Sequence, residues 1–465
     1  MNNRIIRIQS ISIENIKNVS KGEVYLNETN PDSIGASVVG VYGQNGSGKT
    51  ALIWAVGLVK DAMSGLSLPA DTNYYVKQNS EKAEIQMKFD ITIDERQYLV
   101  YYTLAFNAIG ESVQISSESV DFSAKATDKM ARITKTRIIG INYPVESSDL
   151  DNCFYGPDSR ISEMVGNDKQ IRSKLLVLQA LAKEKKNSFI FNDKMTELLK
   201  VTFKDKLYFE ILNTLHYFAR MNLFVLNKNQ ESSFNMNLLP LSMRLCTTDS
   251  ISKSDAVLVG LGQNKANPES FKIIKSIISQ IDILIGSIVP GLKIEIIEKA
   301  TTLNEKAEEE YVFELASDRN GVITPLRYES EGIKKILCIL SSLIAMYNDS
   351  SIFVAIDEMD AGIFEYLLGE ILKTICESGK GQLLFTSHNM RPLEVLDNSN
   401  IYFTTTNPDN KYIQFTGVKN NNNLRMMLLR TIELGGQKEQ IYENTSRYRI
   451  GKAFRKAGAL ANGQK

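Results

Sequence analysis

The 465-residue chain has few of the residues that build disulfide-rich folds or structural metal sites. It contains only four cysteines and two histidines. The cysteines lie far apart, without the paired spacing of a disulfide framework or a zinc site. This distribution predicts a reduced, cytoplasmic chain. The cysteines are Cys153, Cys246, Cys338 and Cys376.

The sequence also lacks an excess of charge of either sign. Lys and Arg total 54 residues, as do Asp and Glu. No global field attracts the chain to nucleic acid or to an anionic membrane, so a charged partner would need a local patch. The N-terminal stretch MNNRIIRIQSISIEN has charge inside its apolar run, and no uninterrupted apolar run of about 18 residues occurs. The sequence thus predicts neither a signal peptide nor a membrane span.

The most informative motif is GQNGSGKT at residues 43–50. An apolar run at residues 37–42 predicts a buried central strand before it, and residues 51–63 are rich in helix formers. This order is that of a phosphate-binding loop, in which Lys49 reaches the β- and γ-phosphates of ATP and the Thr50 hydroxyl binds Mg²⁺. The predicted nucleotide-binding residues are Gly43, Gln44, Asn45, Gly46, Ser47, Gly48, Lys49 and Thr50.

A second motif, SIFVAIDE at residues 351–358, predicts an apolar strand that ends in two acids. Behind a phosphate-binding loop, Asp357 is expected to hold Mg²⁺ together with Thr50. Glu358 is expected to polarise the attacking water, and Lys49 to assist the reaction. The pattern predicts a slow, regulated ATPase that uses ATP and Mg²⁺.

Three further features follow in a fixed order. Ser330 and Gly332 begin a predicted helix, Asp360 comes two residues after Glu358, and His388 follows a strand in LLFTSHN. Together with the loop at residues 43–50, this order resembles the ABC-type ATPases, especially the branch that includes RecF, the SMC proteins and the OLD-type nucleases. The resemblance covers residues 4–406, with the middle of the chain poorly matched.

The resemblance implies a dimer that holds two nucleotides between its subunits. Ser330 and Gly332 of one copy would meet the γ-phosphate that Lys49 of the other copy binds. His388 would act as a catalytic contact to the same phosphate, and Asp360 would belong to the nucleotide site. A serine and free amides at a helix start also suit an anion. The expected assembly is a homodimer or higher homo-oligomer formed through this ATP sandwich.

The predicted fold class is α/β, with an ABC-type P-loop core, an antiparallel β subdomain and an inserted helical subdomain. Period-two patterns at residues 4–13 and 83–106 predict strands, the second a hairpin with its break at residues 94–96. Helical periodicity predicts the insert. The predicted domains are residues 1–158, the first ATPase lobe with the phosphate-binding loop; 159–290, the helical insertion; 291–418, the second lobe with the serine-glycine motif, acidic strand and histidine; and 419–465, a basic C-terminal tail.

The sequence matches the motifs of other classes of P-loop protein less well. A GTPase needs the string Asn-Lys-x-Asp, and the nearest string, at residues 227–230, lacks the acid, so adenine is the expected base. Transporter subunits place the loop and the acidic strand much closer than the 308 residues between Lys49 and Asp357. The 77 residues after His388 are too few for the nuclease domain of OLD-type enzymes. Any DNA cleavage is therefore expected from a separate protein.

Three functions remain open at this stage. The chain resembles the ATPase subunits of bacterial antiphage systems such as PARIS (AriA) and Septu (PtuA), which implies a sensor or scaffold that controls a separately encoded nuclease or toxin, with DNA or a phage protein as trigger. The alternative is a DNA-repair ATPase resembling RecF and the SMC proteins, whose basic run at residues 447–458 contacts DNA. The third is a nucleotide-locked platform with negligible hydrolysis.

Overall fold

The computed structural model describes most of the chain. The described residues are 4–26, 35–126, 131–143, 154–155, 168–203, 205–227, 238–245, 253–304, 307–418 and 423–461. Of the cysteines, Cys153 and Cys246 lie outside them, whereas Cys338 and Cys376 are free thiols. Within the described part, none of the helices has the length and apolarity needed to cross a bilayer.

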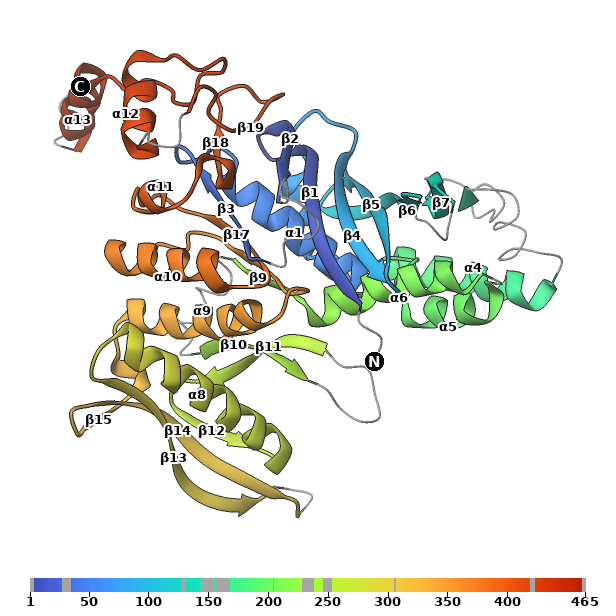
Figure 1. The fold of residues 1–465 in the computed structure, drawn as a ribbon, viewed down its shortest axis with the longest axis horizontal. Helices are drawn as coiled ribbons and strands as arrows, with labels where there is room; N and C mark the ends of the chain where they lie inside the picture. Colours follow the sequence, from blue (N-terminus) through green and yellow to red (C-terminus); the bar gives the residue numbers. More distant parts are fainter. Residues whose placement is uncertain are drawn as a thin grey trace.

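A six-stranded sheet forms the centre of the molecule, with the strand order β19-β18-β3-β17-β16-β9 (Figure 1). The neighbours from β18 to β9 pair in parallel, and β19 is antiparallel to β18. The carboxyl ends of parallel strands meet at one edge, where open α/β sheets bind their ligands. The strands are β3 (Ser37–Tyr42), β9 (Leu223–Leu226), β16 (Phe353–Ile356), β17 (Gln382–Thr386), β18 (Ile401–Thr404) and β19 (Tyr412–Ile413).

Two hydrophobic cores lie on the two faces of this sheet. Side chains of β16 alternate between them: Phe353 and Ala355 join the core that contains α1, and Val354 and Ile356 join the core that contains α9 and α10. This division follows from the period of two along a strand. Strands covered on both faces are almost wholly apolar. The apolar run at residues 37–42 predicted such a strand, and β3 lies in the centre of this sheet. The helices are α1 (Lys49–Met63), α9 (Glu331–Asn348) and α10 (Glu365–Ser378).

The first core also packs against an antiparallel sheet of order β2-β1-β4-β5-β6-β7-β8. In β4 every second residue is buried, as expected for a sheet with one covered face. The predicted break at residues 94–96 is a two-residue turn in which Asp94 and Glu95 both have positive φ, the conformation that suits hairpin twist. The strands are β1 (Ile5–Ile16), β2 (Val19–Tyr25), β4 (Ala83–Ile93), β5 (Arg96–Ile109), β6 (Ser112–Ala124), β7 (Ile133–Asn142) and β8 (Phe154–Tyr155), with the short helix η1 (Ala70–Tyr75) before β4.

The segment 159–290 is not helical throughout, which corrects the prediction for it. Helices α4 (Lys169–Lys185), α5 (Asp193–Thr202) and α6 (Lys206–Met221) come first, but β9 then enters the central sheet beside β16. Strands β10 (Leu238–Leu245), β11 (Lys253–Gly260) and β12 (Gln263–Ala266) follow, before α8 (Pro268–Ile288). A run as short as the LFVL of β9 has no periodicity that separates a strand from a helix.

The second lobe adds a sheet of order β12-β14-β13, with β15 paired to β14. Its strands are β13 (Leu292–Leu303), β14 (Glu309–Arg319) and β15 (Val322–Pro325). The C-terminal region is only partly a separate tail, because Leu424, Leu428 and Ile441 belong to the second core. The remaining helices are η2 (Leu326–Tyr328), α11 (Pro392–Val395), η3 (Asn398–Asn400), α12 (Leu424–Leu434) and α13 (Arg447–Ala461).

His216 in α6 joins the helical segment to the end of α1. Its Nδ1 lies 2.7 Å from the carbonyl oxygen of Met63, and its Nε2 lies 3.0 Å from Nη1 of Arg220. Arginine can only donate, so Nε2 accepts and Nδ1 carries the hydrogen that is donated to Met63. Burial lowers the pKa of His216, and the charge of Arg220 lowers it further. The folded chain therefore favours the neutral ring.

Acidification is expected to destabilise the fold through His216. The unfolded residue takes up a proton near pH 6.5, whereas the folded residue, with its lowered pKa, stays neutral. Its stabilising contribution is present above pH 6.5 and is lost as the pH falls through the folded-state pKa. The urea midpoint should fall between about pH 7.5 and about pH 5.5, and it should fall less in His216→Gln. An equal fall in both proteins would contradict this.

Candidate nucleotide-binding site

Residues 43–48 form a tight loop between β3 and α1. Gly46 and Gly48 have φ of 73° and 105°, a region that glycine adopts without strain. A Cβ at Gly43 would lie 1.7 Å from Oγ1 of Thr404, so the backbone there is closely packed. Helix α1 begins without a side-chain cap and without an acid in its first turn. Its first amides and the positive end of its dipole are thus left for an anion.

Neighbouring elements fix the outer side of the loop. The side-chain amide of Asn18 donates to the carbonyl oxygen of Gly46, and the hydroxyl of Tyr412 donates to that of Gly48 over 2.8 Å. The hydroxyl of Thr404 donates to Oγ of Ser47 over 2.7 Å. Sequence analysis did not find Thr404 and Tyr412, because they lie 357 and 364 residues from their partners and belong to no motif.

Lys49 folds back over the loop that it follows. Its Nζ donates to the carbonyl oxygens of Gly43 and Gln44 over 2.7 and 3.0 Å, and the residue is only 6% exposed. The ammonium is therefore already inside the loop, where phosphate oxygens could replace these neutral acceptors. Hydrogen bonds from a cation to an anion are about twice as strong as those between neutral groups.

The ends of two neighbouring strands bring Asp357 to the start of α1. The hydroxyl of Thr50 lies 3.4 Å from Oδ1 of Asp357, and the hydroxyl of Thr386 donates to the same oxygen over 2.6 Å. Oδ2 of Asp357 is buried without a partner. Oxygen ligands of this kind fit Mg²⁺, which commonly takes one or two protein ligands together with substrate phosphates. Thr50 and Asp357 are thus the residues that could hold Mg²⁺.

Glu358 follows directly and has a strained backbone. Its φ is 49°, which for a residue with a side chain costs on the order of 1 kcal/mol. Its amide donates to Oγ1 of Thr386, and its carbonyl oxygen accepts from Nζ of Lys335, each over 2.7 Å. The surrounding structure therefore fixes Glu358 beside Asp357. The role of Thr386, which contacts both acids, was not predicted.

The structure brings Asp360 and His388 together through the backbone. Oδ2 of Asp360 accepts from the amides of His388 and Asn389 over 3.1 and 2.9 Å. The side chain of His388 is exposed, and Oδ1 of Asp360 is buried without a partner. Asp360 thus fixes the turn that presents His388 to solvent.

Ser330 and Gly332 lie at the start of α9. The hydroxyl of Ser330 accepts from the amide of Ile333 over 3.3 Å, and the residue is exposed. A Cβ at Gly332 would lie 2.2 Å from the carbonyl oxygen of Gly362, so close packing within the chain already requires glycine. Among the described residues, no hydrogen bond joins Ser330 or Gly332 to residues 43–50.

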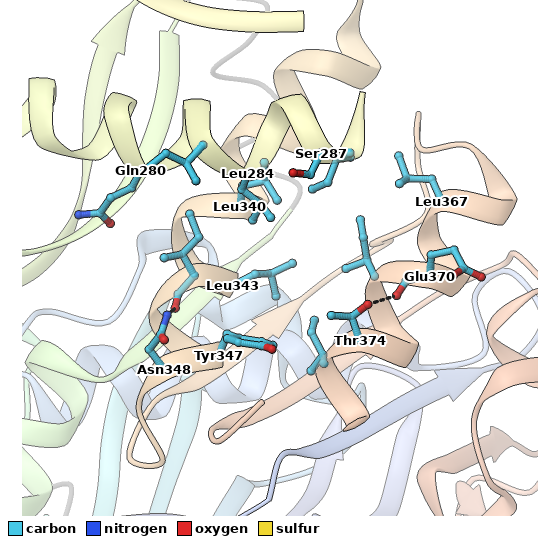
Figure 2. A pocket seen from close by; sticks show the side chains of 15 residues that line it. Gln280, Leu284, Ser287, Leu340, Leu343, Tyr347, Asn348, Leu367, Glu370 and Thr374 are labelled. Atoms are coloured by element: carbon cyan, nitrogen blue, oxygen red, sulfur yellow. Dashed lines mark hydrogen bonds between the residues drawn. The ribbon is translucent and has the colours of Figure 1, made fainter. Parts of the chain in front are cut away.

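A separate groove with a volume of about 630 Å³ lies between α8, α9 and α10 (Figure 2). Figure 2 shows Leu284 of α8, Leu343 of α9 and Leu367 of α10 around it. Among its lining residues, Glu370 is the one charged side chain. Phosphate binding needs cations or free amides, which this lining lacks, so the groove is not a nucleotide site.

A parallel sheet, a glycine-rich loop that encloses its lysine, and a threonine–aspartate pair at the strand ends define a P-loop nucleoside triphosphatase fold. Residues 38–394 match the family described as "AAA domain, putative AbiEii toxin, Type IV TA system". The match covers most of the chain, and the chain belongs to this family.

Solved structures with a similar fold include head domains of SMC proteins. The Smc head bound to the C-winged helix domain of ScpA is 13% identical, with a TM-score of 0.43 over 88% of this chain and 98% of that chain. The Smc head with an extended coiled coil, bound to the C-terminal domain of ScpA from Pyrococcus furiosus, is 13% identical, with a TM-score of 0.39 over 92% and 100%. The SMC head from Thermotoga maritima is 11% identical, with a TM-score of 0.36 over 88% and 99%. No curated protein matches the chain.

Proposed function

We propose that the chain binds and hydrolyses MgATP at residues 43–50. The observation that carries this proposal is the unpartnered, buried Oδ2 of Asp357 beside the hydroxyl of Thr50. Lys49 and the amides at the start of α1 bind the phosphates, and Glu358 takes the proton of the attacking water. Thr50 and Asp357 would hold Mg²⁺, which would supply positive charge against the charge that develops on the phosphates.

We further propose that a second copy of the chain completes the site. Ser330 and His388 are exposed, and the start of α9 is not bonded to the loop of its own chain. In an ATP-held homodimer, Ser330 and Gly332 of one copy bind the γ-phosphate held by Lys49 of the other. His388 and Asp360 belong to the same composite site, His388 as a catalytic contact. ATP then links two subunits as well as serving as substrate.

The biological role that we propose is a cytoplasmic sensor or scaffold of a bacterial antiphage system. The nucleotide state of the dimer controls a separately encoded nuclease or toxin, and DNA or a phage protein is the trigger. The family description associates this type of domain with a toxin–antitoxin system, and such a system includes a second gene product.

One observation favours a second candidate, a DNA-binding repair ATPase of the RecF and SMC type. Helix α13 has five cations and no acid, and its side chains are mostly exposed. Tyr448 and Phe454 on this helix are 72% and 76% exposed. Such a helix suits a nucleic-acid backbone. The cations are Arg447, Arg449, Lys452, Arg455 and Lys456.

Copurification of an effector, together with ATP turnover with and without duplex DNA, separates the two candidates. The defence proposal expects a neighbouring gene to encode a nuclease or toxin that copurifies with the chain, whether DNA or a phage protein is the trigger. The repair ATPase expects severalfold stimulation that weakens steeply with salt and is lost when the five cations of α13 become glutamine. DNA stimulation without any copurifying effector would refute the defence role.

A further inference from the structure

Lys411 lies beside the end of the phosphate-binding loop. Its amide donates to the carbonyl oxygen of Lys21 in β2 over 3.1 Å, and its own carbonyl oxygen accepts from the amide of Thr405 over 2.9 Å. These bonds hold the residue between the β1–β2 hairpin and the end of β18. Its Cε lies 3.3 Å from the position that a Cβ of Gly48 would take. The ammonium is therefore next to Gly48, the residue directly before α1.

The ammonium of Lys411 has no partner within the described chain. The residue is only 4% exposed, and its Nζ makes no hydrogen bond or ion pair there, although the atom itself is not fully enclosed. Burial lowers the pKa of Lys411, whereas the charge of Glu443 raises it and that of Lys77 lowers it. Buried ammonium groups are normally paired, because they lose the hydration of their charge. A largely desolvated ammonium without a partner, beside an anion-binding loop, is suited to an anionic ligand.

Glu443 supplies the nearby negative charge, and it lies in a segment that touches the loop. Its amide donates to Oε1 of Gln44 over 3.0 Å. The amide of Thr406 donates to the carbonyl oxygen of Gln440 over 2.7 Å, which fixes this segment to the end of β18. The carboxylate of Glu443 is close enough to influence Lys411 but forms no ion pair with it.

We propose that Lys411 is a second lysine for the phosphate chain of the nucleotide. Lys49 binds from within the loop, and Lys411 binds from the side of the β1–β2 hairpin. In the absence of nucleotide, the carboxylate of Glu443 offsets the charge of Lys411. When nucleotide binds, its phosphate supplies the negative charge instead. This inference rests on the proposed nucleotide site at residues 43–50, to which it adds a ligand that no motif contains.

Calorimetric titrations with MgATP and with magnesium tripolyphosphate test the proposal. Lys411→Met should weaken both ligands by about tenfold or more, because each loses a charge-assisted hydrogen bond. Lys411→Arg should stay within about threefold of the wild type. Lys21→Met is the matched control, because it removes an exposed lysine of β2 whose backbone contacts Lys411. This variant should bind both ligands as the wild type does. Melting temperatures confirm that each variant folds.

Two results would overturn the proposal. The first is binding of both ligands by Lys411→Met within about twofold of the wild type. The second is weakening for MgATP alone, since tripolyphosphate has no ribose or base and the contact would then lie outside the phosphates. A wild-type chain that binds neither ligand would instead refute the proposed function itself. If Lys411→Met does not fold, Lys411→Gln serves for the same comparison.

Glu443→Gln is expected to change MgATP affinity in the direction opposite to that of Lys411→Met. Removing the charge that offsets Lys411 should tighten MgATP binding by about threefold. The amide of residue 443 can still bond to Gln44, so the segment keeps its place. Unchanged or weaker binding in this variant would contradict the role given to Glu443.

Discussion

Replacing Lys49 by alanine is expected to weaken MgATP binding by about a hundredfold or more and to abolish hydrolysis. The Lys49 ammonium is buried inside the loop, bonded to the carbonyl oxygens of Gly43 and Gln44. In the proposed site, its loss would leave the β- and γ-phosphates without the ammonium that the loop encloses. A missing charged hydrogen-bond partner in such a site costs about 3 kcal/mol.

Titration calorimetry and phosphate release measure the two effects. Lys169→Ala, which removes an exposed lysine at the start of α4, is the matched control and should behave as the wild type. The melting temperature of Lys49→Ala shows whether the variant is folded, so that a loss of binding can be assigned to the missing ammonium. Binding within about tenfold of the wild type would show that the nucleotide lies elsewhere.

The isosteric change Glu358→Gln is expected to lower hydrolysis by about a hundredfold to a thousandfold while MgATP affinity stays within about threefold. Glutamine keeps the shape of the side chain but cannot accept the proton of water, and general base catalysis contributes effects of this size. The backbone amide of residue 358 donates to Thr386 and its carbonyl oxygen accepts from Lys335, and neither bond involves the side chain that is changed. The variant should therefore accumulate in the ATP-bound state.

Phosphate release and gel filtration with MgATP test this expectation. The ATP-bound variant should elute as a dimer and persist after dilution, whereas the wild type should return to monomer as ATP is consumed. Glu365→Gln, at the exposed start of α10, is the control. Hydrolysis within about tenfold of the wild type would remove Glu358 from the role of base. A wild type that never turns over would favour the nucleotide-locked platform.

Much of the candidate nucleotide-binding site could be predicted because its residues are contiguous in the sequence. The run 37–42, the glycine-rich loop and the following helix are contiguous, so their sequence contains all that is needed to place Lys49 and Thr50. Asp357 was predictable because a buried strand places its last residue at the carboxyl edge of the sheet. The turn at Asp94 and Glu95 was predictable as the break between two period-two runs.

Other parts depend on contacts between distant segments and could not be predicted. Strand β9 is four residues long, and only its pairing with β16 makes it part of the central sheet. Thr386 acquires its role because β17 lies beside β16, which aligns its hydroxyl with both acids. Tyr412 and Lys411 reach the loop only because β18 pairs with β3. A single threonine, tyrosine or lysine has no local signature for such a position.

The claim that two chains share each nucleotide is tested most directly by mixing two inactive variants. Lys49→Ala destroys the loop half of a site, and Ser330→Glu places a negative charge against the γ-phosphate from the other half. A mixed dimer contains one site with both halves intact, so random mixing should restore about a quarter of the wild-type turnover. Turnover no greater than the mean of the separate variants would show that each chain forms its site alone.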